Sequence, residues 1–180
     1  LTPLPQGGNP KPRLFRLTED RAVINRMGFN NGGQAEAIER LRLMPRTGRV
    51  IGINIGANKD ATDRIADYVT GVRQMAPYAD YLTVNISSPN TPGLRALQGR
   101  GPLDELLGAV MTERGKHGPP VFLKVAPDLE PADIQDIATS VIEHKVDALI
   151  VSNTTISRPP LRSAHADETG GLSGAPLHDL

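Results

Sequence analysis

The chain has 180 residues, of which 38% are hydrophobic, and this length suits one domain with one sizeable core. Its 20 lysine and arginine residues are balanced by 20 acidic residues, and only 3% of residues are aromatic, so we expect no nucleic-acid surface. Cysteine is absent, which excludes disulfide bonds and thiolate metal sites.

Both ends of the sequence are typical of interior parts of a longer polypeptide. Residues 1–12 form a segment rich in proline and glycine, without the apolar stretch of a signal peptide. Residues 175–180 resemble the first turn of a helix. No apolar run approaches the roughly 20 residues that span a bilayer. We therefore expect a soluble segment of a domain that continues beyond both ends.

Strands and helices alternate from residue 34 onward. A helix over Gln34–Leu43 is expected after the turn at residues 30–33. Nearly continuous apolar runs predict four buried parallel strands, over Val50–Ile55, Tyr81–Ile86, Val121–Val125 and Ala148–Val151. The helices between them carry apolar faces formed by Ile65, Val69, Val72 and Ala76, by Leu103, Leu106, Leu107, Val110 and Met111, and by Ile134, Ile137, Ala138, Val141 and Ile142. This order predicts a parallel α/β sheet with right-handed crossovers.

Parallel α/β domains are either open sheets or (β/α)₈ barrels. An open dinucleotide-binding sheet needs a G-x-G-x-x-G turn after a strand, and only an isolated Gly56 follows the first strand here. A barrel instead carries functional residues at the carboxyl ends of successive strands, with a repeat of about 31 residues. Asn54, Asn85, Lys124 and Asn153 lie at such ends, 31, 39 and 29 residues apart. We predict four of the eight units of a barrel.

These strand-end side chains suggest a common ligand. A single asparagine at such a position is most often a turn residue. Several together predict a ring of hydrogen-bonding groups, because buried amides must be satisfied. Lys124 has two simple interpretations, a side chain that extends to solvent or an ion pair with Asp128. Its functional interpretation is a fixed positive charge beside a cofactor that becomes negative during turnover.

The segment from Asn85 to Arg95, N-I-S-S-P-N-T-P-G-L-R, combines amides, two serines and two prolines directly after a predicted strand. The simplest alternative is an ordinary Ser-Pro turn before a helix. No histidine is near in sequence to activate either serine, which argues against an acyl-transfer triad. The four histidines of the chain also show no metal-ligand spacing, so no metal site is expected.

Several segments together resemble the dihydroorotate dehydrogenases, in the same order and spacing and nearly from end to end. They are residues 25–30 (N-R-M-G-F-N), 52–56 (G-I-N-I-G), 85–95, 124–129 (K-V-A-P-D-L), 152–155 (S-N-T-T) and 168–174 (E-T-G-G-L-S-G). The opening, Pro5 to Leu17, resembles the loop after the second barrel strand of that family. The absence of cysteine favours the class 2, quinone-linked branch, since class 1 relatives carry a cysteine at the position of Ser88.

The resemblance implies an α/β fold of the (β/α)₈ TIM barrel type, of which this chain supplies roughly strands 3–6 and their helices. Residues 1–180 would then be part of a single FMN-binding barrel domain. The implied reaction oxidises (S)-dihydroorotate to orotate in de novo pyrimidine (UMP) biosynthesis, with FMN as hydride acceptor and a quinone as final electron acceptor. The implied location is peripheral, on the cytoplasmic face of the bacterial inner membrane, through a segment outside this chain.

The resemblance also assigns roles to individual residues. Ser88 corresponds to the catalytic base that takes the C5 proton. The family's cofactor contacts correspond to Asn54, Asn85, Lys124, Ser152 and Gly174, with Ser152 standing where threonine is common. Its substrate contacts correspond to Asn25, Arg26, Met27, Gly28, Phe29, Asn85, Asn90, Asn153 and Thr154. The alternatives are another FMN-dependent barrel oxidoreductase acting on a reduced pyrimidine, and a non-catalytic barrel fragment. These 180 residues alone are expected to bind FMN poorly or not at all.

Overall fold

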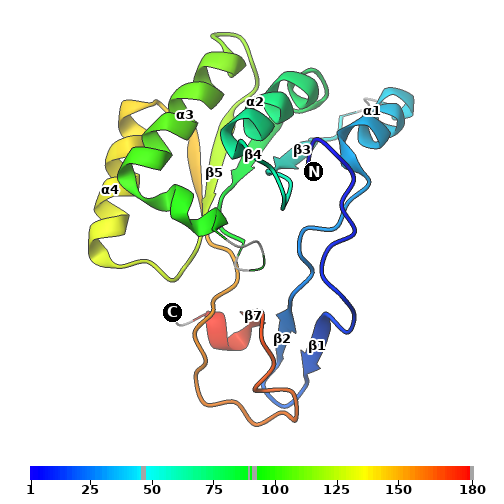
Figure 1. Cartoon of the computed structure of the whole chain (residues 1–180), viewed down its shortest axis with the longest axis vertical. Coiled ribbons are helices and arrows are strands. Elements are labelled where there is room, and N and C mark those ends of the chain that lie inside the picture. The colour runs from blue at the N-terminus through cyan, green and yellow to red at the C-terminus, as the bar shows by residue number, and fades with distance from the viewer. Residues whose placement is uncertain (46–47, 89, 91–92, 179–180) are drawn as a thin grey trace.

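The computed structural model describes the chain except for residues 46–47, 89, 91–92 and 179–180. It contains a four-stranded parallel sheet and a three-stranded antiparallel sheet. Helices lie along one side of the parallel sheet, and the antiparallel sheet lies beyond the carboxyl ends of the parallel strands (Figure 1). A ligand at those ends would therefore lie between the two sheets.

The parallel sheet has the order β3-β4-β5-β6. Its strands are β3 (Gly52–Ile55), β4 (Tyr81–Asn85), β5 (Val121–Val125) and β6 (Ala148–Val151), which confirms the four predicted strands. The helices are α1 (Gly33–Leu43), α2 (Arg64–Met75), α3 (Arg100–Arg114) and α4 (Pro131–Glu143). Short 3₁₀ turns occupy Ala76–Tyr78, Leu94–Gln98 and Ala175–Leu177. Among the described residues, no helix is long and apolar enough to cross a membrane.

The main core lies between the parallel sheet and its helices. Alternate strand residues such as Ile55, Val84 and Leu123 are buried there, and α3 adds the fully buried Leu103, Leu106, Leu107 and Val110. Each such leucine contributes roughly 2 kcal/mol of hydrophobic stabilisation. Since side chains alternate along a strand, the residues between these apolar positions point to the opposite face of the sheet. That face carries most of the polar strand residues.

Two predicted helix faces differ from the structure. In α2 the buried side chains are Tyr68, Val72 and Met75, whereas the predicted Ile65 and Val69 are only half-buried. The face is rotated because the ring of Tyr68 packs in the core while its hydroxyl donates to the Asn85 carbonyl oxygen at 2.6 Å. Burial also raises the pKa of Tyr68, so this hydroxyl remains a donor.

The second difference concerns α4 and the last parallel strand. Ile134 and Ile142 of α4 are exposed, although both belong to the predicted apolar face. Leu149 and Val151 of β6 are exposed as well. The reason is topological, because β6 ends the four-stranded sheet and no described element covers this side of it.

The antiparallel sheet was not predicted. It has the order β1-β2-β7, with β1 (Leu14–Leu17), β2 (Ala22–Asn25) and β7 (Gly171–Gly174). A separate small core holds it together, made of Phe15, Leu17, Ala22, Ile24 and Leu172. Residues 14–17, interpreted above as part of a loop, form a hairpin with β2. This sheet fixes Asn25, the last residue of β2, opposite Gly171 of β7.

Candidate functional site

A pocket of about 430 Å³ lies at the carboxyl ends of the parallel strands. Its walls come from the segment after β2, the end of β4 and the loop that follows it, β5, and the residues after β6. The lining side chains are Asn25, Met27, Gly28, Phe29, Asn30, Asn85, Ser88, Asn90, Lys124, Asn153 and Thr154. Of these, only Asn30 is absent from the predicted site. The structure thus brings most of the predicted residues to one cavity.

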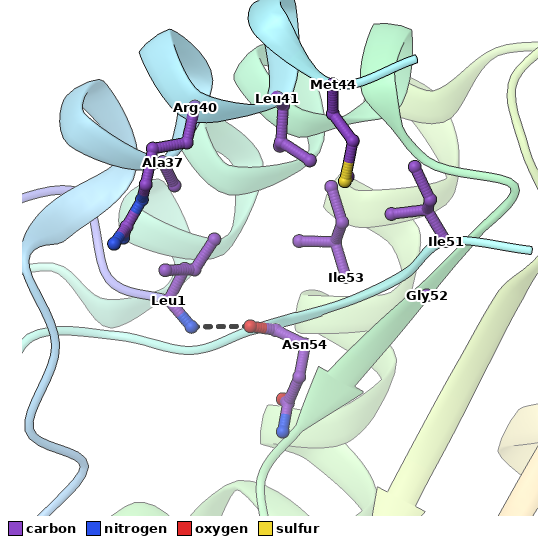
Figure 2. A pocket seen from close by; sticks show the side chains of 9 residues that line it. All are labelled: Leu1, Ala37, Arg40, Leu41, Met44, Ile51, Gly52, Ile53 and Asn54. Atoms are coloured by element: carbon purple, nitrogen blue, oxygen red, sulfur yellow. Dashed lines mark hydrogen bonds between the residues drawn. The ribbon is translucent and has the colours of Figure 1, made fainter. Parts of the chain in front are cut away.

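Asn54 does not line this pocket. It pairs with Thr83 in the register of β3 and β4, so it points to the same face of the sheet as Asn85 but lies two residues further from the strand ends. Figure 2 shows it at the edge of a different, mostly apolar hollow between α1 and β3, with its amide directed away from Leu41 and Met44. Its backbone oxygen accepts a hydrogen bond from the Leu1 amino group. A role for Asn54 in cofactor binding stays a prediction.

Three other predicted residues are also outside the pocket. The guanidinium of Arg26 pairs with Glu168 at 2.8 Å and lies over the Phe15 ring, 4.5 Å from its centroid. Ser152 is half-buried, and its hydroxyl donates to the Asn153 carbonyl at 3.2 Å. Gly174 borders a separate hollow beside β1 and β2. The structure therefore does not place these residues with the others, and their assigned roles stay predictions.

Hydrogen bonds connect the amides on the strand side of the pocket. The Asn85 Oδ1 atom accepts from the Ser87 backbone N–H at 3.2 Å and from the Ser87 hydroxyl at 2.7 Å. The same hydroxyl accepts from Asn153 Nδ2 at 2.9 Å, and Asn153 Oδ1 accepts from the Thr154 N–H at 2.8 Å. This chain of bonds joins the end of β4 to the end of β6.

The opposite wall is formed by the segment after β2. Asn90 Nδ2 donates to the Asn25 backbone oxygen at 3.1 Å, which ties the loop after β4 to the end of β2. The Asn90 backbone N–H donates to Ser88 Oγ at 3.3 Å. Gly28 has φ of 73°, a left-handed value that suits glycine, and turns the chain toward the pocket. The neighbours Pro89, Thr91 and Pro92 lie outside the described residues.

Lys124 is half-buried in β5 and faces the pocket. Its ammonium group has no hydrogen-bond or ion-pair partner in the described part of the chain. The predicted alternative, an ion pair with Asp128, is wrong, because Asp128 pairs with Arg95 at 2.8 Å. A half-buried cation without a protein partner lowers the energy of an anionic ligand beside it.

Arg95 and Asp128 form a bracket behind the pocket. Arg95 donates to the Ser87 carbonyl and to the Thr154 carbonyl, each at 3.2 Å, besides its ion pair with Asp128. Asp128 also accepts the hydroxyl of Thr155 and the backbone N–H of Ile156. The bracket therefore holds together the loops after β4, β5 and β6. Neither this role nor that of Ser87 was predicted, although an acid four residues after Lys124 at a strand end was a usable signal.

Burial alone would raise the pKa of Asp128. Hydrogen bonds from Thr155 and Arg95, with the positive charge of Arg95, outweigh that effect and hold the pKa below its ordinary value. The carboxylate is therefore ionised at neutral pH and keeps the Arg95 guanidinium compensated. The ion pair thus keeps the three loops in place wherever the carboxylate stays ionised.

A second small hollow, next to the pocket, is lined by Phe29, Gly56, Ala57, Asn85, Ser88 and Leu94. Phe29 is a non-glycine residue with φ of 58°, and a Cβ atom at Gly56 would lie 2.7 Å from its ring. We expect Gly56→Ala to lower the free energy of unfolding by about 1–3 kcal/mol through overpacking. Urea unfolding of the full-length protein measures this. Gly101→Ala in α3 is the matched control, because a Cβ atom at Gly101 would have no neighbouring atom within 4 Å. This variant should not lower the free energy of unfolding. Equal losses for the two variants would contradict the close packing of Phe29 against Gly56.

A parallel α/β sheet with a polar pocket at the carboxyl ends of its strands is the arrangement expected of part of a (β/α)₈-barrel protein. The sequence profile described as dihydroorotate dehydrogenase matches residues 1–180. The chain belongs to the dihydroorotate dehydrogenase family.

Individual relatives agree with this membership. The chain is 69% identical over 180 residues to the dihydroorotate dehydrogenase (quinone) of Erythrobacter litoralis, covering 100% of this chain and 52% of that protein. It is 66% identical to the protein of the same name from Sphingopyxis alaskensis, covering 100% and 51%. The ligand-free crystal structure of DHODH from Eimeria tenella superposes with a TM-score of 0.90 at 45% identity, covering 99% and 57%. The chain thus spans about half the length of the relatives it matches, and the predicted partial barrel is confirmed.

Proposed function

We propose that this chain is part of an enzyme that oxidises (S)-dihydroorotate to orotate, with FMN as hydride acceptor and a quinone as final electron acceptor. The observation that carries the proposal is the placement of Ser88 in one pocket with several amides and the Lys124 ammonium. The family membership and the names of the relatives support it. The reaction would be the redox step of de novo pyrimidine (UMP) biosynthesis.

The residues of the pocket fit FMN. Among the described residues, neither the half-buried Lys124 ammonium nor Nδ2 of Asn85, its register partner on β4, has a protein partner. When bound, FMN supplies the acceptor for a hydride from C6 of the substrate. Lys124 would stabilise negative charge on the reduced ring by proximity. We assign cofactor binding to Asn85 and Lys124 first, and to Asn54, Ser152 and Gly174 as further contacts that a complete barrel would bring together.

The pocket also suits the substrate. Dihydroorotate carries a carboxylate and two ring carbonyls, which accept hydrogen bonds, and ring N–H groups, which donate them. The amide nitrogens of Asn25 and Asn85, which have no partner in the described part of the chain, supply donors, and Oδ1 of Asn90 supplies an acceptor. Fixing a planar ring by several such groups lowers the barrier through orientation. We include Met27, Gly28, Phe29, Asn153 and Thr154 in this substrate site, with Arg26 as the weakest of the predicted contacts.

Ser88 would act as the base that removes the C5 proton. A serine hydroxyl is a weak base, so it needs a hydrogen-bonded route for the proton and a site shielded from bulk water. Ser88 is half-buried, and its oxygen accepts the Asn90 N–H. It also borders the small hollow beside Phe29 and Leu94. These apolar neighbours limit the access of water to the hydroxyl.

The test uses the full-length protein. Purified protein should contain bound FMN, reduce a dye when dihydroorotate is added, and show an orotate difference spectrum stronger than that of other pyrimidines. If the protein contains flavin but prefers a different reduced pyrimidine, the result favours another FMN-dependent barrel oxidoreductase. Protein without flavin and without activity would favour a non-catalytic barrel fragment.

The electron acceptor and location form a separate part of the proposal. We propose a quinone as acceptor and peripheral contact with the cytoplasmic face of the bacterial inner membrane, through a segment outside these 180 residues. The names of the relatives support the quinone. Reoxidation of the dihydroorotate-reduced, full-length protein by a soluble quinone should be much faster than by NAD⁺. Faster reoxidation by NAD⁺ would overturn this part and leave the oxidation step in place.

A further inference from the structure

We propose that Ser87, the neighbour of Ser88, is a positioning residue that turns N–H groups of Asn85 and Asn153 toward the bound ligand. The inference rests on the proposed function, because it concerns the orotate site of the same pocket. Ser87 does not line the pocket and is completely buried, with 0% exposure. Its effect must therefore act through the two asparagines that it contacts.

Backbone N–H groups identify which end of each amide is the oxygen, because an N–H group can only donate a hydrogen bond. The backbone N–H of Ser87 donates to one end of the Asn85 amide at 3.2 Å, so that end must be the oxygen. The backbone N–H of Thr154 identifies the oxygen of Asn153 in the same way, at 2.8 Å. The remaining end of each amide is then a nitrogen.

The Ser87 hydroxyl contacts both amides, because it accepts one hydrogen bond and donates another. It accepts from Asn153 Nδ2 at 2.9 Å and donates to Asn85 Oδ1 at 2.7 Å. Asn85 Oδ1 thus receives two hydrogen bonds, which leaves Asn85 Nδ2 as the end available to the pocket. No described group accepts from that nitrogen. The second N–H of Asn153 has no described partner either.

The consequence is that Asn85 and Asn153 present amide nitrogens to the pocket. These nitrogens match the carboxylate and carbonyl oxygens of orotate. Without the Ser87 hydroxyl, Asn85 Oδ1 keeps only the longer bond from the Ser87 backbone N–H, so the orientation of this amide is held less strongly. A rotated amide would present an oxygen to an anionic ligand, which disfavours binding. Ser87 therefore sets selectivity for acceptor-rich ligands.

The test compares two ligands on the full-length, FMN-loaded protein. Orotate has a carboxylate that only accepts hydrogen bonds, whereas its carboxamide, orotamide, also donates them. We expect Ser87→Ala to weaken orotate binding roughly 10- to 100-fold and orotamide binding much less, as measured by flavin difference spectra. The selectivity ratio is the diagnostic quantity, because a merely structural defect would weaken both ligands equally.

Ser140→Ala is the matched control, since Ser140 is a serine of α4 that is also 0% exposed but lies outside the pocket. It should bind both ligands like the original protein. If Ser87→Ala loses FMN, the closer-sized Ser87→Cys variant gives the same comparison. An unchanged selectivity ratio in the variant that retains FMN would overturn the role of Ser87 alone. Absence of orotate binding in the original protein would overturn the proposed function and this inference together.

Discussion

Replacing Ser88 by alanine should slow the reduction of the flavin by dihydroorotate by several orders of magnitude, as expected when a general base is removed. Orotate affinity should stay nearly unchanged, because orotate has already lost the proton that Ser88 removes. Among the described residues, the only hydrogen bond of the Ser88 oxygen is the one from the Asn90 N–H, at 3.3 Å. Loss of the hydroxyl therefore removes no bond that holds the pocket walls together.

Stopped-flow absorbance under single-turnover conditions measures this rate directly, without the later reoxidation step. The matched control is Thr139→Ala in α4, where the hydroxyl donates only to the Gln135 carbonyl within the same helix. That variant should reduce its flavin at the original rate. Comparable rates for Ser88→Ala and the original protein would remove Ser88 from its assigned role. A parallel loss of orotate affinity would instead indicate a collapsed pocket.

Ser88 and its neighbour Ser87 differ in whether their roles could be predicted from the sequence. Ser88 was predicted because a resemblance assigns it a role, and the structure places it in the pocket. Ser87 was not predicted, because its role depends on hydrogen bonds to Asn85 and to Asn153, which is 66 residues away. A spacing pattern predicts which residues meet at the strand ends. It does not predict which end of an amide faces the ligand.

The fold likewise contains parts that a local sequence pattern predicts and parts that it does not. The four parallel strands were predictable because each lies in a short, nearly continuous run of apolar residues. The antiparallel strands have four residues each, and β7 pairs with β2 about 150 residues earlier in the chain, so no local pattern indicates their pairing. The same long-range contact explains Arg26, which pairs with Glu168, 142 residues away, instead of lining the pocket.

Replacing Asp128 by asparagine should lower both stability and activity, because it breaks the bracket behind the pocket. The variant leaves the Arg95 guanidinium, with its side chain only 21% exposed, without a charged partner. Loss of hydrogen bonds to a charged group of this partial burial should cost about 1–2 kcal/mol of unfolding free energy at pH 7. Ser87 and Thr154 lose their anchored donor, so kcat/KM for dihydroorotate should fall roughly tenfold through misplacement of the site.

The lowered pKa of Asp128 determines how this loss of stability changes with pH. The pKa of Asp128 is lowered in the folded protein, so the stabilisation is present above the ordinary carboxyl pKa and is lost as the pH falls through the lowered value. The stability difference between the original protein and Asp128→Asn should therefore be largest at neutral pH and shrink in acid below about pH 4. Urea unfolding at a series of pH values measures both curves.

Glu113→Gln is the matched control for the Asp128 variant. Glu113 pairs with Arg73 through two hydrogen bonds, of 2.8 and 2.9 Å, and Arg73 is largely exposed. The pKa of Glu113 is also lowered, chiefly by the hydrogen bond from Arg73, so its pH dependence has the same sign. Glu113→Gln should nevertheless lower the free energy of unfolding by less than Asp128→Asn, because solvent screens an exposed ion pair. It should leave kcat/KM unchanged. Equal effects of the two variants on kcat/KM would show that Asp128 contributes nothing specific to the site, because Glu113 of α3 pairs with Arg73 of α2, and neither residue lines the pocket.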